Sequence, residues 1–164
     1  MVFSIEALVL VAFKVAGICT VLNGKVSKCL ILDNTTWDGV IGDDALEGIK
    51  IGSFGIGKTF ITLQSWAKKL KQKGAILAIC SKNTEPAVKE PFEKHPDMIL
   101  KIDDISVFIA NWDNKADSIR HIQQVLNIGF DSMVFIDDNP FERSIVRQNL
   151  PEVTVPELPE DPAE

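Results

Sequence analysis

The chain alternates short apolar runs with stretches in which apolar residues recur every three or four positions. Several of the runs are apolar on both faces, which is typical of strands in the middle of a parallel sheet. The alternation predicts an α/β protein. We identify five strand candidates: KCLILD at 28–33, AILAIC at 75–80, MILKI at 98–102, SMVFIDD at 132–138 and EVTV at 152–155.

Helical spacing of apolar residues fills the intervals between these runs. One predicted helix spans 60–70 and is closed by Gly74, a residue suited to a helix C-cap. A second spans 116–126, a third begins at Pro140, and a further helix follows the second strand candidate. Such strand–helix–strand repetition implies a doubly wound, Rossmann-type, mostly parallel sheet of five strands, joined by right-handed crossovers.

The composition narrows the class of protein. With 164 residues, the chain is long enough for one domain with a substantial core. Its net charge of −6, without a basic cluster, argues against nucleic acid as a partner. Cys19, Cys29 and Cys80 lie in apolar runs and lack the spacing of metal ligands, a pattern that suits reduced, buried thiols and a cytoplasmic location.

The two ends of the chain differ from its centre. Residues 1–27 are largely apolar, but Glu6 and Lys14 interrupt them and they have no cationic start. This composition favours a helical lead-in over a secretory signal or a membrane span. Residues 157–164 are rich in proline and acidic side chains and are predicted to form an extended tail. The folded core is therefore placed at 28–156.

Polar side chains follow three of the strand candidates. The first ends in Asp33, the second in Ser81, and the fourth in Asp137 and Asp138. Because ligands of an open parallel sheet bind where the strands end, these side chains should converge on one crevice. Carboxylate oxygens suit Mg²⁺, which usually binds together with a substrate phosphate, and Lys115 at the start of a helix would supply a second cation. Each residue alone is more simply read as a turn or helix cap, but together they favour a phosphate site.

Seven stretches of the chain resemble the haloacid-dehalogenase (HAD) superfamily, in particular its subfamily IIIC, the FkbH-like domains. They are KCLILD, WDGVIGDDALEGIKIG, CSKN, FEKHPDMILKIDDI, NWDNKADSIR, LNIGFDSMVFIDDNPFER and VPELPEDPA. The resemblance implies Mg²⁺-dependent phosphatase or phosphoryl-transfer chemistry through an aspartyl-phosphate. It also implies a phosphorylated small molecule as substrate. Some family members load a glyceryl unit from 1,3-bisphosphoglycerate onto an acyl carrier protein, so the resemblance further implies an acyl carrier protein as partner.

The resemblance assigns a role to each matched residue. Ser81 would hydrogen-bond the phosphoryl oxygens, and Lys115 would neutralise developing charge and hold the nucleophile. The short connection between Asp33 and Ser81 leaves no room for a large cap domain, so the site should be fairly open. The implied catalytic residues are Asp33, Thr35, Ser81 and Lys115, the substrate-binding residues are Ser81, Lys82, Asn83 and Trp37, and the metal-binding residues are Asp33, Asp137 and Asp138.

The first motif departs from the family pattern. Family members end this strand in two aspartates one residue apart, the nucleophile and then the acid/base, typically Asp-x-Asp-Asn-Thr-x-Trp-Gly-Gly. This chain has LDNTTWDG, which is two residues shorter. Aligned from the strand, Asp33 is the nucleophile and Thr35 stands at the acid/base position. Aligned from the loop, Asp33 is the acid/base and Ile31 stands at the nucleophile position.

The apolar run fixes Asp33 at the end of its strand, which favours the first alignment. Thr35 cannot act as a comparable acid/base, and such help is typically worth ~10²–10⁴-fold, so hydrolysis should be slow. A third alternative is that two residues of the motif are missing from the sequence.

Two other functions compete with a phosphatase. The shortened motif suggests a catalytically silent domain that binds a partner or scaffolds a larger enzyme. The segment GSFGIGKT at 52–59 also matches the phosphate-loop pattern G-x-x-x-x-G-K-[ST]. A phosphate loop must follow a buried strand, whereas the preceding LEGIKI is short and carries Glu47 and Lys50. A P-loop NTPase is therefore the weaker interpretation.

Overall fold

The computed structural model describes residues 29–33, 35–36, 51 and 57–157, apart from the side chains of 57–59. The predictions for the lead-in at 1–27, for Trp37, for most of the segment GSFGIGKT and for the tail beyond Glu157 lie outside these residues.

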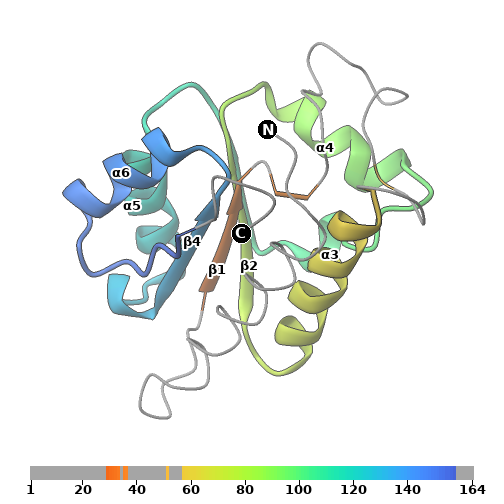
Figure 1. Ribbon diagram of the computed structural model, residues 1–164, viewed down its shortest axis with the longest axis horizontal. Coiled ribbons are helices and arrows are strands. Elements are labelled where there is room, and N and C mark those ends of the chain that lie inside the picture. The colour runs from red at the N-terminus through yellow and green to blue at the C-terminus, as the bar shows by residue number, and fades with distance from the viewer. Residues whose placement is uncertain (1–28, 34, 37–50, 52–56, 158–164) are drawn as a thin grey trace.

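Four parallel strands form the described sheet. They are β1 (Cys29–Asp33), β2 (Ile76–Ser81), β3 (Val107–Ala110) and β4 (Met133–Asp137). Their order is β3-β2-β1-β4, so β1 lies between β2 and β4 (Figure 1). The chain moves outward from β1 to β3 and then returns to the other side of β1 for β4. Ligands of such sheets bind where the strand order reverses, which here is the carboxyl end of β1.

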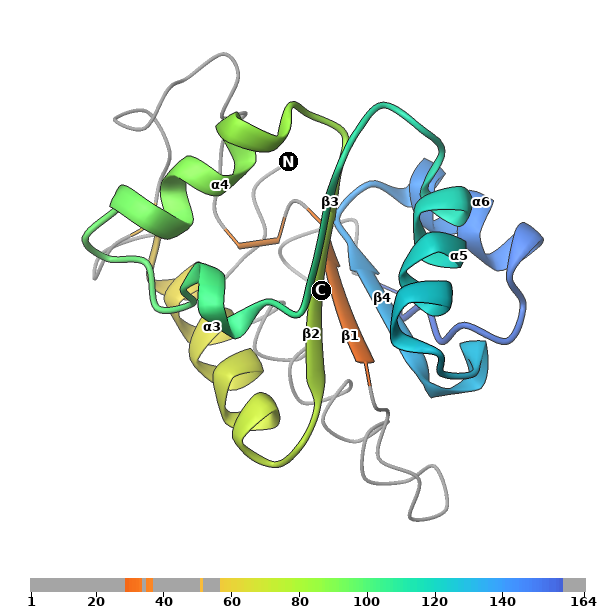
Figure 2. The same ribbon diagram turned by 180° about the vertical axis from the view of Figure 1, so that it is seen from behind.

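Helices cover both faces of the sheet. Helices α3 (Gly57–Gln72) and α4 (Glu85–Lys94) lie on one face, and α5 (Lys115–Leu126) and α6 (Pro140–Asn149) lie on the other (Figures 1 and 2). Two short 3₁₀ helices, η1 (Ile102–Asp104) and η2 (Phe130–Ser132), precede β3 and β4. The predicted doubly wound α/β fold is confirmed, and the described residues contain no large cap domain. None of the described helices is long and apolar enough to cross a bilayer.

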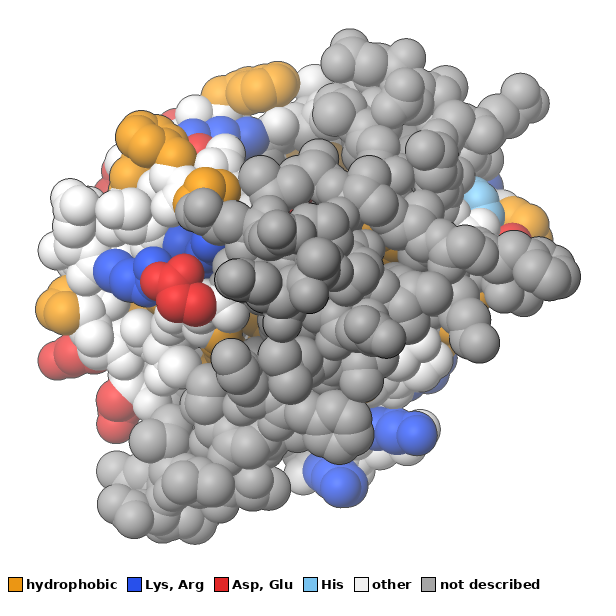
Figure 3. Space-filling model, viewed as in Figure 1, with side chains coloured by type: hydrophobic (Ala, Val, Ile, Leu, Met, Phe, Trp, Pro, Cys, Tyr) orange, Lys and Arg blue, Asp and Glu red, His pale blue; other side chains and the backbone are white. Residues whose placement is uncertain are grey.

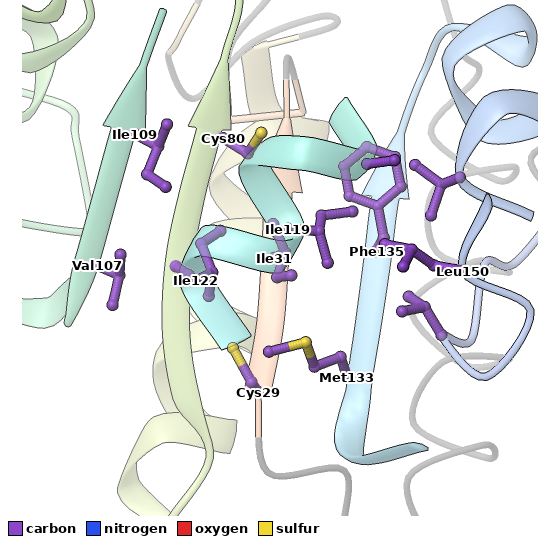
Figure 4. Packing of buried hydrophobic residues seen from close by; sticks show 14 residues of the cluster. Cys29, Ile31, Cys80, Val107, Ile109, Ile119, Ile122, Met133, Phe135 and Leu150 are labelled. Carbon is purple, nitrogen blue, oxygen red and sulfur yellow. The ribbon is translucent and has the colours of Figure 1, made fainter. Parts of the chain in front are cut away.

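The alternation of side chains along β1 divides the core into two halves. Leu30 and Leu32 pack on the side of α3 and α4, whereas Cys29 and Ile31 pack on the side of α5 and α6. Figure 4 shows the second half, in which Ile119 of α5 lies near Ile31. Because side chains alternate with a period of two, the strand's last residue has the same parity as Ile31 and is directed toward the α5 side.

The third strand candidate is wrong. MILKI does not form a strand, and β3 lies further along the chain. Met98 and Leu100 are nevertheless buried in the core. The amides of Ile99 and Leu100 donate to the side-chain oxygen of Gln64, at 2.9 and 3.1 Å, and not to a neighbouring strand. An apolar run can therefore be buried without extending the sheet, provided that other groups satisfy its backbone.

The fifth strand candidate contributes only one residue to the sheet. Thr154 donates to the carbonyl of Met133 at 3.0 Å and accepts from the amide of Phe135 at 2.9 Å. Pro151 and Pro156 bracket the run, and proline lacks the N–H that a longer ladder requires. The described sheet therefore has four strands in place of the predicted five.

The predicted helix boundaries follow the expected capping chemistry. The Asn114 side chain accepts from the amide of Asp117 at the start of α5, and Asn127 ends that helix in the left-handed conformation at φ 51°. Gly74 takes a φ of 100° after α3, which favours glycine. Pro140 begins α6. These caps place the first turns of α5 and α6 at the carboxyl edge of the sheet.

Candidate active site at the carboxyl edge of the sheet

Two carboxyl groups lie side by side at this edge. Asp33 and Asp137 end neighbouring strands and are paired in register. They are 6% and 1% exposed, and each carboxyl group affects the pKa of the other. Burial raises the pKa of Asp137 to about 9, and the charge of Asp33 adds to this effect. Burial also raises the pKa of Asp33, although the nearby cation Lys115 opposes the shift. The pair therefore retains a proton at neutral pH when no further cation is present.

Lys115 supplies the positive charge of the site. It is the first residue of α5, and its side chain is only 2% exposed. Its Nζ lies 2.5 Å from Oδ2 of Asp33 and 3.3 Å from the carbonyl oxygen of Cys80. Burial alone would lower the pKa of Lys115, but the charge of Asp33 opposes this and the pKa is raised overall. Lys115 is thus a buried ammonium group held against Asp33.

The turn from β4 into α6 is fixed by hydrogen bonds. The amide of Asn139 donates to Oδ1 of Asp137 at 2.8 Å, and the side chain of Asn139 caps α6 by accepting from the amide of Phe141. Among the described residues, Oδ2 of Asp137 is buried without a hydrogen-bond partner. Arg143 donates through one nitrogen to the carbonyls of both Asp137 and Asp138, at 3.0 and 2.9 Å.

The residues after β2 lie at the same edge of the sheet, but two of their side chains already contact other groups of the protein. Ser81 is half-buried at the end of β2, next to β1. Lys82 lies 2.5 Å from Oε1 of Glu142, in the first turn of α6. The side chain of Asn83 accepts from the amide of Thr84 at 2.7 Å. The structure therefore brings the predicted substrate-binding residues 81–83 to the site.

The loop after Asp33 is held by a side chain that the sequence did not single out. Thr35 is buried, and its hydroxyl oxygen has no partner among the described residues. The carbonyl of Thr36 accepts from Nε2 of Gln64 at 2.6 Å. Gln64, Glu142 and Arg143 are thus the site's unpredicted polar residues. Glu142 and Arg143 lie at the end of the matched stretch LNIGFDSMVFIDDNPFER, which is their only signal in the sequence.

The donor atoms fit a cation that retains several water ligands. Within the part of the chain that the structure describes, no group of three or more His, Cys, Asp or Glu side chains could enclose a metal ion. Two adjacent carboxyl groups are present, however, and the unpartnered Oδ2 of Asp137 is a free hard-oxygen donor. Mg²⁺ is commonly bound by one or two carboxylates, with water and substrate phosphate completing the octahedron.

One of the solved structures similar to this chain shares more than half of its sequence. The N-terminal part of the protein BF1531 from Bacteroides fragilis, a crystal structure containing a phosphatase domain complexed with Mg, is 60% identical with a TM-score of 0.82. The match covers 92% of this chain and 42% of that chain, so this chain spans less than half of its relative. A HAD family enzyme from Bacteroides thetaiotaomicron, in complex with magnesium and inorganic phosphate, is 14% identical with a TM-score of 0.43 over 96% of this chain and 86% of that one. Likeness at that level carries no conclusion.

No protein-family model and no curated protein matches the chain. The family is instead shown by the match to the phosphatase domain, together with the strand order and the strand-end residues of the matched motifs. The chain belongs to the haloacid-dehalogenase superfamily.

Proposed function

We propose that this domain is a Mg²⁺-dependent phosphatase or phosphoryl transferase of the FkbH-like kind, acting through an aspartyl-phosphate on Asp33. The observation that carries the proposal is the buried contact of 2.5 Å between Lys115 and Asp33, beside Asp137. The close relative's phosphatase domain and its bound Mg support the same chemistry. The substrate and partners of the longer protein are part of the proposal.

The position of Asp33 favours its role as nucleophile. In the alternative alignment Ile31 would occupy the nucleophile position, but Ile31 is fully buried in the core between β2 and β4. Asp33 is the residue whose carboxylate contacts Lys115. A strand end beside a buried cation is where a phosphoryl group can be attacked and its charge neutralised.

Each residue of the site has a separate role in the proposed reaction. One oxygen of Asp33 forms a bond to phosphorus as the bond from phosphorus to the leaving oxygen breaks, and the leaving oxygen keeps the electron pair. Lys115 neutralises charge on the phosphoryl group, and Ser81 donates a hydrogen bond to it. Asp33 and Asp137 would hold Mg²⁺ through their carboxylates, with Asp138 of the same turn binding or orienting it, and the ion would supply further positive charge to the phosphoryl oxygens. Water then attacks the phosphorus, releasing phosphate and freeing Asp33.

Thr35 determines which leaving groups are favourable. A threonine hydroxyl cannot protonate a departing oxygen as a carboxylic acid can, and general acid help is typically worth ~10²–10⁴-fold. A carboxylate or phenolate leaves without a proton, whereas an alkoxide does not. We therefore favour acyl and aryl phosphates over alkyl phosphates. The specific substrate that we propose is a glyceryl acyl phosphate, 1,3-bisphosphoglycerate, whose acyl phosphate is cleaved at the P–O bond to leave a carboxylate. Transfer of the glyceryl unit to an acyl carrier protein in the cytoplasm, which we propose for the longer protein, is a separate reaction: the carrier thiol forms a bond to the acyl carbon as the bond from that carbon to the phosphate oxygen breaks, and phosphate leaves.

The test is the release of phosphate from acetyl phosphate, p-nitrophenyl phosphate and glycerol 3-phosphate, with and without Mg²⁺. We expect Mg²⁺-dependent turnover of the first two and little of the third. Asp33→Asn should reduce turnover to background. The matched control Asp113→Asn, which changes an exposed aspartate on the same edge, should not. Melting temperatures check that both variants fold. Undiminished turnover in Asp33→Asn would exclude the covalent mechanism.

A second candidate is a catalytically silent binding or scaffold domain, because Thr35 stands where the acid/base is expected. The phosphoryl analogue BeF₃⁻ separates the two functions. With Mg²⁺ it should raise the melting temperature of an intact phosphoryl site and leave that of a silent domain unchanged.

A further inference from the structure

Arg143 is a buried charge that the proposed reaction does not use. The residue is 2% exposed, so its guanidinium group is almost completely removed from water. Its nearest acidic partner, Glu157, lies 3.6 Å away and is largely exposed. Its Nε has no hydrogen-bond partner among the described residues. Removing a cation from water costs several kcal/mol unless it is well paired, so stability alone does not explain this arginine.

The hydrogen bonds that Arg143 does make are with the candidate metal loop, the turn Asp137–Asn139 between β4 and α6. One terminal nitrogen bridges the carbonyl oxygens of two consecutive residues, Asp137 and Asp138. The amide of Asn139 holds Oδ1 of Asp137 from the same side. The backbone and one carboxylate oxygen of the loop are therefore fixed from the α6 side, while Oδ2 of Asp137 remains available. This is how a ligand is held in place by a group that does not touch the metal.

We propose that Arg143 is a positioning residue that sets the affinity for Mg²⁺ by fixing the backbone of Asp137 and Asp138. The inference rests on the proposed function, because it takes these aspartates as metal ligands. Charge and geometry predict opposite effects of removing Arg143. A positive charge behind the site repels Mg²⁺, so a pure charge effect would make the variant bind more tightly. Loss of the two hydrogen bonds would instead leave the ligands imprecisely placed, and binding would weaken.

The chain offers a matched control on the same helix. Arg147 lies one turn further along α6, and it pairs with the same Glu157 at 2.6 Å. It also donates to the carbonyl of Val155 at 2.9 Å, but no described contact joins it to the Asp137–Asp138 turn. Arg143→Met and Arg147→Met therefore remove the same charge and a contact with the same acid. Only Arg143→Met removes the hydrogen bonds to the metal loop.

The experiment is a calorimetric titration of the metal-free domain with Mg²⁺ alone. Groups that orient metal ligands are typically worth about 10–100-fold in affinity. We expect Arg143→Met to weaken Mg²⁺ binding by at least about 10-fold and Arg147→Met to change it less than about 2-fold. Arg143→Lys keeps the charge and can reach a single carbonyl, so it should fall between wild type and Arg143→Met. It also provides the measurement if Arg143→Met does not fold.

The outcomes separate this inference from the proposed function. Equal affinities for wild type and the Arg143 variants, or tighter binding by them, would overturn the positioning role while the phosphatase proposal stands. An equal loss in the Arg143 and Arg147 variants would also overturn it, since the loss would then not depend on the hydrogen bonds from Arg143 to the carbonyls of Asp137 and Asp138. A wild-type domain that does not bind Mg²⁺ would overturn both.

Discussion

Replacing Lys115 by methionine should destabilise the domain in a way that depends on pH. The substitution keeps an unbranched side chain, shorter by one atom, and removes its charge. It leaves Asp33 buried beside Asp137 with no described cation in contact, whereas in the wild type Nζ of Lys115 lies 2.5 Å from Asp33. The pair is almost fully buried, so solvent screening does little to reduce its contribution.

The magnitude follows from the cost of leaving one partner of a buried ion pair alone, about 3–5 kcal/mol. Proton uptake limits this cost, because burial already raises the pKa of Asp33 and loss of Lys115 removes the opposing attraction. A buried carboxyl with a raised pKa binds a proton in the folded state that the unfolded chain has released. The loss relative to wild type should therefore be greatest at high pH and diminish as the pH falls toward the carboxyl's unfolded pKa of about 4.

Urea unfolding without Mg²⁺, at pH 5 and pH 8, measures the effect. We expect a loss of about 3–5 kcal/mol at pH 8 for Lys115→Met and a smaller loss at pH 5. The double variant Asp33→Asn/Lys115→Met, which removes both charges, should recover most of the loss. Lys94→Met, at an exposed lysine of α4, serves as control and should leave the midpoint unchanged. A pH-independent loss, or a double variant no more stable than Lys115→Met, would refute the reasoning.

Two further predictions concern the neighbouring groups. Because the pKa of Asp137 is raised to about 9, the folded state holds a proton that the unfolded state lacks between about pH 4 and pH 9. In EDTA the free energy of unfolding should therefore fall with rising pH, by at most about 1.4 kcal/mol per unit, and Asp137→Asn should make this slope shallower. Gln64→Leu leaves one carbonyl and two amides without their partner and should cost about 3 kcal/mol in urea unfolding, whereas Gln148→Leu at an exposed position of α6 should cost little.

The sequence was sufficient to predict those strands that follow from the local pattern of apolar residues. The runs ending in Asp33, Cys80 and Asp137 are apolar on both faces, and each forms a parallel strand: β1 and β2 are central, and β4 lies at one edge of the described four-stranded sheet. The run MILKI has the same appearance and is not a strand. What distinguishes it is the backbone partner of Ile99 and Leu100, which is a glutamine 35 and 36 residues away. Hydrophobic pattern reports burial, but it does not report which group satisfies the backbone.

The same limit explains which site residues could be found. Asp33, Ser81 and Asp137 follow from the rule that ligands bind at strand ends, and Lys115 follows from the start of its helix. Arg143 could not be found this way, because the role proposed for it depends on hydrogen bonds to two backbone carbonyls in the turn before α6. Buried polar residues that act on backbone atoms carry no spacing signal of their own.

The shortened first motif is consistent with an intact strand because of side-chain parity. A deletion of two residues preserves the alternation along β1, so Cys29 and Ile31 still face α5 and α6 and the strand still ends on that face with Asp33. A deletion of one would have turned the last carboxylate away from Lys115 and placed both core faces in the wrong environment. The loss therefore falls on the loop, where Thr35 stands and where the hydrogen bond from Gln64 to Thr36 fixes the path of the chain. In the proposed function, attack by Asp33 and proton delivery are separable for this reason: the first would depend on β1 and α5, and the second on a loop position that here carries the hydroxyl of Thr35.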